Sequence, residues 1–198
     1  EPVGANGRAC VSCHQPADGM SLSLQSIKER WDATQGKDPI FAPIDGMNCP
    51  NLPAGDPASH SILLKRGLFR IFLPWPPKAA DGTPIDPEFT IEVVRDPGGC
   101  NTDPGYGLNS PNPMISIYRR PRVAANLEYV VQQRFGVSPF VGKTGEPAAR
   151  DPETGRPLNQ NMMADARQAT LRTQAVEAGV THLQMLEKLT DAQLQQIE

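Results

Sequence analysis

The hydrophobic pattern predicts helices near both ends of the chain and short strands between them. Residues 7–34 fit a helical segment that is interrupted at Gly19. After this interruption, one face of a helix carries Leu24, Ile27, Lys28 and Trp31. We therefore expect an amphipathic helix that packs this face against the rest of the protein.

The middle of the chain is predicted to contain a short helix followed by a β-hairpin. Asp56 precedes a proline, which suits the N-cap and first position of a helix that ends at Gly67. Two runs rich in β-branched and aromatic residues follow, Phe69–Leu73 and Phe89–Val94. Because these runs are neighbours in sequence, we expect a hairpin insertion over residues 67–96.

Further short elements complete the pattern. Ile115–Tyr118 fits another strand, and residues 126–135 fit a helix. Residues 161–198 are predicted to form the C-terminal helices, with a long helix over 161–177 and a last one capped by Thr190. The connecting segments are rich in Pro, Gly, Asp and Asn and are expected to be long loops.

Composition and charge exclude several classes of protein. The chain has 21 Pro and 17 Gly in 198 residues, which argues against a long coiled coil or a regular helical bundle. Its net charge of −3 gives no basic field for nucleic acid or an anionic membrane. Charge or proline interrupts every apolar stretch well before the roughly 20 residues that cross a bilayer, so we expect no transmembrane segment.

The strongest chemical signal lies close to the N-terminus. Cys10-Val11-Ser12-Cys13-His14 matches C-x-x-C-H, the attachment sequence of a c-type haem. Two cysteines at this spacing lie one helical turn apart, so both thiols can add to the vinyl groups on one edge of a porphyrin. The histidine that follows can bind the iron as proximal ligand. We therefore expect one covalent haem c on Cys10 and Cys13, with His14 on the iron.

Three other interpretations of these two cysteines stay open. A zinc site would need a second pair of ligands, and Cys49 and Cys100 stand isolated from each other in the sequence. A thioredoxin-like redox pair would need a βαβ unit, which the pattern does not predict. The third interpretation is a structural disulfide between Cys10 and Cys13.

The remaining cysteines and the first residues indicate an exported protein. The sequence starts at Glu1 without a methionine, as expected after removal of a signal peptide. Covalent haem attachment also takes place outside the bacterial cytoplasm. In an oxidising compartment Cys49 and Cys100, both in predicted loops, are expected to form a disulfide, with free buried cysteines as the alternative. We expect a periplasmic or otherwise exported location.

The sixth iron ligand is predicted from the other histidines and the methionines. His60 is the first choice as distal ligand and catalytic residue, with a solvent-exposed histidine as the alternative. Met114 is the second choice. Met20 lies too close to His14 in sequence to reach the other face of the ring and is expected to fill the core, and His182 is expected to be exposed.

Two arginines are candidate contacts of the cofactor. Arg119 and Arg120 follow the predicted strand and precede a proline. Either could bind a haem propionate through a charge-assisted hydrogen bond. The alternative is a solvated strand end.

With these residues identified, the chain resembles the N-terminal haem domain of the bacterial di-haem cytochrome c peroxidase and MauG superfamily. The resemblance rests on the haem motif and on four stretches: Asp18–Ser21, Phe41–Pro43, Gly67–Pro74 and Ser116–Pro121. It implies that this domain carries the peroxidatic haem. It also implies that electrons arrive from a second haem in another domain or chain, and that calcium can bind between the two.

The sequence departs from that family in two places. It holds a single C-x-x-C-H, so the second haem domain is absent from this chain. The Trp-Asp-Gly-Arg stretch common in the family is also missing where residues 140–146 would match it. We therefore expect the chain to be the first part of a longer or two-chain protein.

These features together predict a mostly α fold, a single c-type cytochrome domain over residues 1–198 with a small β-hairpin and many long loops. Its haem-attachment helices are expected over residues 7–34. The expected function is that of a haem oxidoreductase, peroxidase-like or MauG-like, which handles peroxide or electrons. A six-coordinate electron-transfer cytochrome and a ligand-sensing or structural haem domain are the alternatives. The expected partner is an electron-donor or acceptor protein, not nucleic acid.

Overall fold

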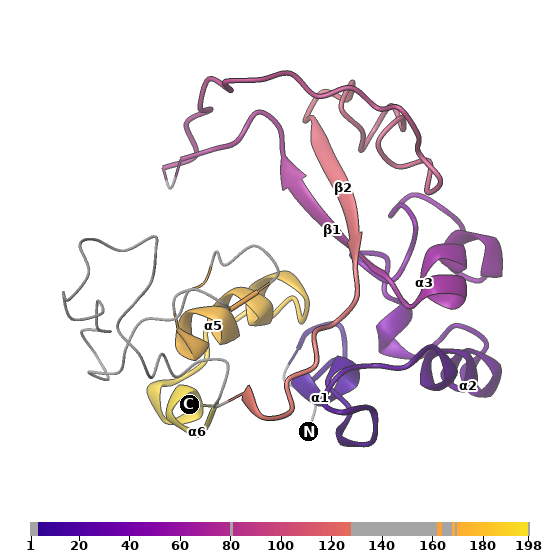
Figure 1. Cartoon of the computed structure of the whole chain (residues 1–198), viewed down its shortest axis with the longest axis vertical. Coiled ribbons are helices and arrows are strands. Elements are labelled where there is room, and N and C mark those ends of the chain that lie inside the picture. Colours follow the sequence, from indigo (N-terminus) through magenta and orange to yellow (C-terminus); the bar gives the residue numbers. More distant parts are fainter. Residues whose placement is uncertain (1–3, 80, 128–161, 164–167, 169, 198) are drawn as a thin grey trace. The chain divides into compact units, whose positions relative to one another are not determined.

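The computed structural model describes residues 4–79, 81–127, 162–163, 168 and 170–197 (Figure 1). The chain divides into two compact units. One unit is formed by Glu1–Met20 with Arg122–Glu198, and the other by Ser21–Pro121. The sequence predicted one domain over the whole chain, whereas the structure places the haem motif and His60 in different units.

The unit Ser21–Pro121 is built on a two-stranded antiparallel sheet (Figure 1). Strand β1 (Phe69–Pro74) pairs with strand β2 (Met114–Arg119), so that Phe69 lies opposite Arg119 and Pro74 opposite Met114. The strand predicted at Ile115–Tyr118 is therefore confirmed.

The predicted hairpin between Phe69–Leu73 and Phe89–Val94 is wrong. Residues 89–94 form no strand, and the side chains of Phe89 and Val94 are 64% and 92% exposed. The pattern of residues marks an extended run but does not identify its partner, because pairing also depends on contacts made by distant segments.

Those distant contacts centre on Ser116 of β2. The guanidinium of Arg70 in β1 donates from Nε to Ser116 Oγ at 2.9 Å, and from Nη1 to the carbonyl of Ile44 at 2.8 Å. On the other side, the Asn101 side chain accepts from Ser116 N at 2.7 Å and donates to Ser116 O at 2.9 Å. Asn101 thus pairs with β2 much as a strand residue would, which ties the register of the sheet to the loop before it.

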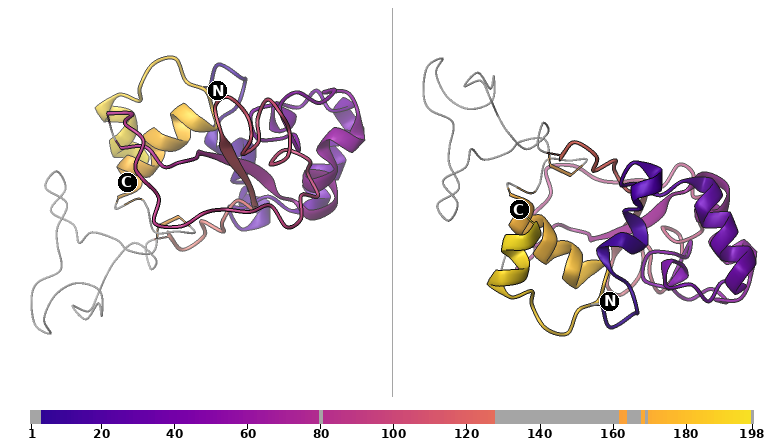
Figure 2. Two further views of the ribbon diagram at one scale, coloured as in Figure 1. Left: turned by 90° about the horizontal axis from the view of Figure 1, so that it is seen from above. Right: turned by 90° about the horizontal axis from the view of Figure 1, so that it is seen from below.

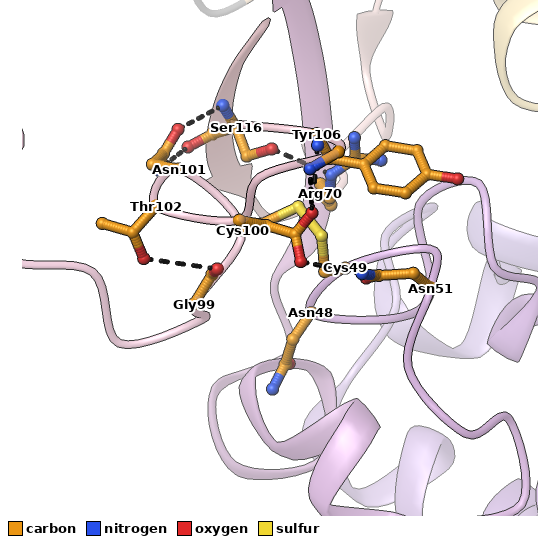
Figure 3. Close-up of a disulfide and its surroundings, with 12 residues drawn as sticks. Asn48, Cys49, Asn51, Arg70, Gly99, Cys100, Asn101, Thr102, Tyr106 and Ser116 are labelled. Atoms are coloured by element: carbon orange, nitrogen blue, oxygen red, sulfur yellow. Dashed lines mark hydrogen bonds between the residues drawn. A yellow bond between two sulfur atoms is a disulfide. The ribbon is translucent and has the colours of Figure 1, made fainter. Parts of the chain in front are cut away.

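A disulfide fixes that loop (Figure 3). Cys49 and Cys100 are bonded and almost fully buried, with a Cα–Cα distance of 5.1 Å, so the predicted disulfide is confirmed. Cys100 immediately precedes Asn101. The bond therefore holds the long connection between β1 and β2 at the point where that connection hydrogen-bonds to β2.

Short helices complete this unit. Helix α2 (Leu24–Thr34) starts at Ser23, whose hydroxyl accepts from Ser26 N, and it buries Ile27 and Trp31, which confirms the predicted amphipathic helix. The 3-10 helix η2 (Pro39–Phe41) follows.

The second predicted helix of this unit is also confirmed. Asp56 caps the 3-10 helix η3 (Pro57–His60) by accepting from Ala58 N at 2.9 Å. Helix α3 (Ser61–Arg66) continues directly from η3. It ends at Gly67, whose φ of 65° suits a residue without a Cβ atom.

The other unit contains helix α1 (Cys10–Cys13), the 3-10 helix η1 (Pro16–Asp18), and helices α5 (Leu171–Thr181) and α6 (Asp191–Ile197). Helices α5 and α6 pack against each other (Figure 2). Thr190 Oγ1 accepts from Gln193 N, which confirms the predicted cap of the last helix. The predicted helix over 126–135 and the first part of that over 161–177 lie largely outside the described residues.

The structure contradicts the predicted mostly α cytochrome fold. No helix among the described residues is longer than 11 residues, and the haem-attachment segment 7–34 is one turn of α-helix, a 3-10 turn and α2 rather than continuous helix. The described residues between β1 and β2 contain no helix at all. In the attachment segment, Pro16 starts the 3-10 turn and Gly19, with a φ of 66°, ends it, so that no helix runs from Cys13 to Leu24. No described helix is long and apolar enough to span a bilayer.

Removing the disulfide should weaken the unit Ser21–Pro121. The bond closes a sequence separation of 51 residues. By the chain-entropy model, its loss costs on the order of 4 kcal/mol of unfolding free energy. We expect the double variant Cys49→Ser/Cys100→Ser to lower the urea midpoint accordingly, and an unchanged midpoint would contradict this role.

Tyr118 should make stability fall at alkaline pH. Its hydroxyl donates to the carbonyl of Asn48 at 2.7 Å. Burial, and next the charge of Asp96, raise its pKa to about 12 from the usual 10.0. Below pH 10 the group is protonated in both the folded and the unfolded chain. Between about pH 10 and 12 only the unfolded chain loses the proton, so the unfolding free energy should fall with a steeper slope than in Tyr118→Phe, measured by urea titration at each pH.

Candidate haem-attachment site

Helix α1 presents the two cysteines of the motif on one helical turn. Ser12 Oγ accepts from Ala9 N at 3.0 Å, and His14 N donates to the carbonyl of Cys10 at 3.0 Å, which closes the turn at both ends. Cys10 is exposed and Cys13 half-buried, and neither takes part in a disulfide. The predicted attachment residues therefore lie on an accessible turn with both thiols intact.

His14 follows this turn and is oriented by a backbone carbonyl. Its Nδ1 lies 2.8 Å from the carbonyl oxygen of Met20. Because a carbonyl oxygen can only accept, Nδ1 carries the hydrogen. In the neutral ring Nε2 then holds the lone pair, which is the arrangement that metal-binding histidines use.

The segment before the motif is fixed to the end of helix α5. The carbonyl of His182 accepts from Asn6 Nδ2 at 2.8 Å and from Arg8 Nη1 at 3.2 Å. The Arg8 side chain is fully buried. These bonds place the start of α1 against the C-terminal helices of its own unit.

His60 is not placed as an iron ligand would be. It is fully buried in the unit Ser21–Pro121, with Nδ1 2.8 Å from the carbonyl of Gly46 and Nε2 2.8 Å from that of Ala54. Whichever tautomer the ring adopts, both nitrogens face carbonyl oxygens, so neither directs a lone pair toward an external metal. The rings of Trp31 and Phe41 pack against it, with centroids at 5.0 and 5.5 Å. This conformation makes His60 a core residue that joins two loops, and its predicted role as distal ligand stays a prediction that this packing disfavours.

The other predicted site residues are placed as follows. Met114 begins β2 and is half-buried, and Arg119 ends that strand. The guanidinium of Arg120 donates to the carbonyl of Arg66 at the C-terminal end of α3, at 2.7 Å. This contact caps α3, and the predicted bond of Arg119 or Arg120 to a haem propionate stays a prediction. His182 is half-buried and ends helix α5.

Sequence reasoning missed the role of Met20. The residue acts through its backbone oxygen, and a backbone contact leaves no trace in the pattern of side chains. The only signal was the turn at Ala17-Asp18-Gly19, which indicates that the chain reverses shortly after His14.

Among the described residues, no group of three or more His, Cys, Asp or Glu side chains could hold a metal ion.

Comparison of the chain with protein-family models, with curated proteins and with solved structures gives no significant match.

Replacing His60 should cost stability. In His60→Ala, the buried carbonyl of Gly46 and the carbonyl of Ala54 lose the ring that faces them, and a cavity opens beside Trp31 and Phe41, so we expect a loss of about 3 kcal/mol in unfolding free energy. The matched control is His182→Ala, which leaves the carbonyl of His182 in place. Chemical denaturation measures both, and equal stability of the two variants would contradict a core role for His60.

Proposed function

We propose that this chain is a c-type haem protein with one haem bound covalently to Cys10 and Cys13 and with His14 as the proximal iron ligand. The observation that carries the proposal is the hydrogen bond of 2.8 Å from His14 Nδ1 to the carbonyl of Met20. It leaves Nε2 as the metal-binding nitrogen on the residue next to two accessible thiols. The donor set and its spacing thus fit this cofactor.

Zinc binding and a redox dithiol explain fewer of the motif's three side chains than haem attachment does. Zinc would need further ligands, and the described residues supply no group of three or more at this place or elsewhere. A redox dithiol explains the two cysteines but gives no reason for an oriented histidine beside them. Haem attachment uses all three side chains.

We propose further that the protein is an oxidoreductase of the peroxidase-like class. His60, the first candidate for the sixth ligand, has both ring nitrogens against carbonyl oxygens, which favours a sixth position open to a small ligand. When bound, haem supplies one-electron chemistry and an iron atom that peroxide can reach. Reduction of one peroxide to two waters consumes two protons and two electrons, and a partner protein would supply the electrons.

The chain's own residues have defined roles in this proposal. Cys10 and Cys13 hold the porphyrin edge, and His14 holds the iron, oriented by the carbonyl of Met20. The buried disulfide Cys49–Cys100 supports an oxidising, periplasmic or otherwise exported location. The resemblance of the quoted stretches to di-haem cytochrome c peroxidases supports a second haem, in another chain or domain, as the electron source.

The first test is the attachment itself. We expect the chain, expressed in a bacterium with c-type maturation machinery, to keep its haem on a denaturing gel. Cys10→Ala/Cys13→Ala should lose it completely, whereas Cys49→Ala/Cys100→Ala should keep it if the protein is recovered. A colourless native-sequence protein, or haem retained by Cys10→Ala/Cys13→Ala, would contradict the proposal.

The second test separates catalysis from electron transfer. A peroxidase-like site predicts a high-spin ferric spectrum that changes on addition of cyanide or peroxide. His60→Ala should leave this spectrum unchanged. A low-spin spectrum insensitive to both additions would support the six-coordinate cytochrome instead, with Met114→Ala as the variant that should then convert it to high spin.

A further inference from the structure

The carbonyl that orients His14 belongs to an unusual turn. Gly19 and Met20 are consecutive residues in the left-handed region, with φ values of 66° and 59°. Glycine adopts this conformation readily, but a residue with a Cβ atom does so at an energetic cost. Met20 is therefore held in a disfavoured conformation directly at the residue whose oxygen contacts His14.

Hydrogen bonds on both sides stabilise this turn. Met20 N donates to the carbonyl of Gln15 at 2.8 Å. Ala124 N donates to the carbonyl of Met20, and Ala125 N to that of Gly19, each at 3.3 Å. The Met20 oxygen thus accepts from the His14 ring and from a segment more than 100 residues later in the sequence.

We propose that Met20 is a positioning residue for the iron ligand and that it acts through its left-handed backbone, not through its sulfur. The turn aims the carbonyl at Nδ1, and this hydrogen bond fixes the tautomer of His14 that leaves Nε2 for the metal. The inference rests on the proposed haem site for its purpose, but the hydrogen bond exists in the chain without haem. A hydrogen bond at Nδ1 also makes the imidazole a stronger donor to the iron, which lowers the reduction potential.

The test compares substitutions with opposite effects on the left-handed conformation. Met20→Gly removes the whole side chain and allows the turn. Met20→Val keeps an apolar side chain, but its β-branch disfavours the turn. The matched control is Met185→Val, because Met185 belongs to the same unit and its φ is not in the left-handed region, so a β-branched residue fits its backbone.

The first measurement uses the full chain without haem, with Cys10→Ser/Cys13→Ser to prevent attachment. Nitrogen-15 NMR of the neutral His14 ring should show hydrogen on Nδ1 in the parent, in Met20→Gly and in Met185→Val. In Met20→Val the hydrogen should move mainly to Nε2, the form that an imidazole favours in water. Loss of the Nδ1–H form in Met20→Gly, or its retention in Met20→Val, would overturn the inference.

The second measurement uses the haem-loaded protein. Met20→Gly should keep the reduction potential of the parent, and Met20→Val should raise it. Equal potentials in Met20→Gly and Met20→Val would also overturn the inference. If Met20→Val does not fold, Met20→Gly alone still tests the inference. A changed tautomer of His14 or a changed reduction potential in Met20→Gly would show that the side chain of Met20, not its backbone, positions His14. If no haem attaches, the proposed function fails while the NMR measurement still tests the positioning role.

Discussion

One hydrogen bond, from His14 Nδ1 to the carbonyl of Met20, orients the imidazole beside the two cysteines of the motif, and the proposed haem site depends on it. Without it, the imidazole would rotate freely beside the two accessible thiols of Cys10 and Cys13, and these three side chains would not point to one kind of site. With it, the ring has a fixed orientation and presents Nε2 as a ligand. The proposed haem site would use this orientation, because the histidine would bind the iron of a porphyrin that the two thiols anchor.

The unit Ser21–Pro121 has long connections and few regular elements, so it needs contacts other than those within helices and strands. Polar contacts and a covalent bond stabilise it together with its apolar core. Arg70 is buried and hydrogen-bonded within the unit, and desolvation lowers its pKa while Tyr118 and Asp45 oppose that effect. The disulfide fixes the loop whose Asn101 borders the sheet. His60 similarly joins the loops at Gly46 and Ala54 through its two nitrogens.

The features that the sequence predicted correctly depend on contacts between nearby residues or on distinctive chemistry. The cap at Asp56, the helical face of Ile27 and Trp31, and the helix stop at Gly67 all follow from contacts within a few residues, and the disulfide follows from cysteine number and compartment. The strand partner of Phe69–Leu73 and the role of His60 could not be predicted, because they depend on Ser116 and on carbonyls of distant loops. The mostly α fold was predicted from helical patterns over 7–34, 126–135 and 161–198 together with the cytochrome motif, and one turn of helix at Cys10–Cys13 does not determine the rest of a chain.

The most direct test of the account is mass spectrometry of the peptide that contains Cys10, Cys13 and His14, taken from protein matured in a bacterial periplasm. The account predicts that this peptide is heavier by one haem, through two thioether bonds that survive acid and thiol reductants. Recovery of the same peptide with two unmodified thiols, or with a disulfide between them, would contradict it.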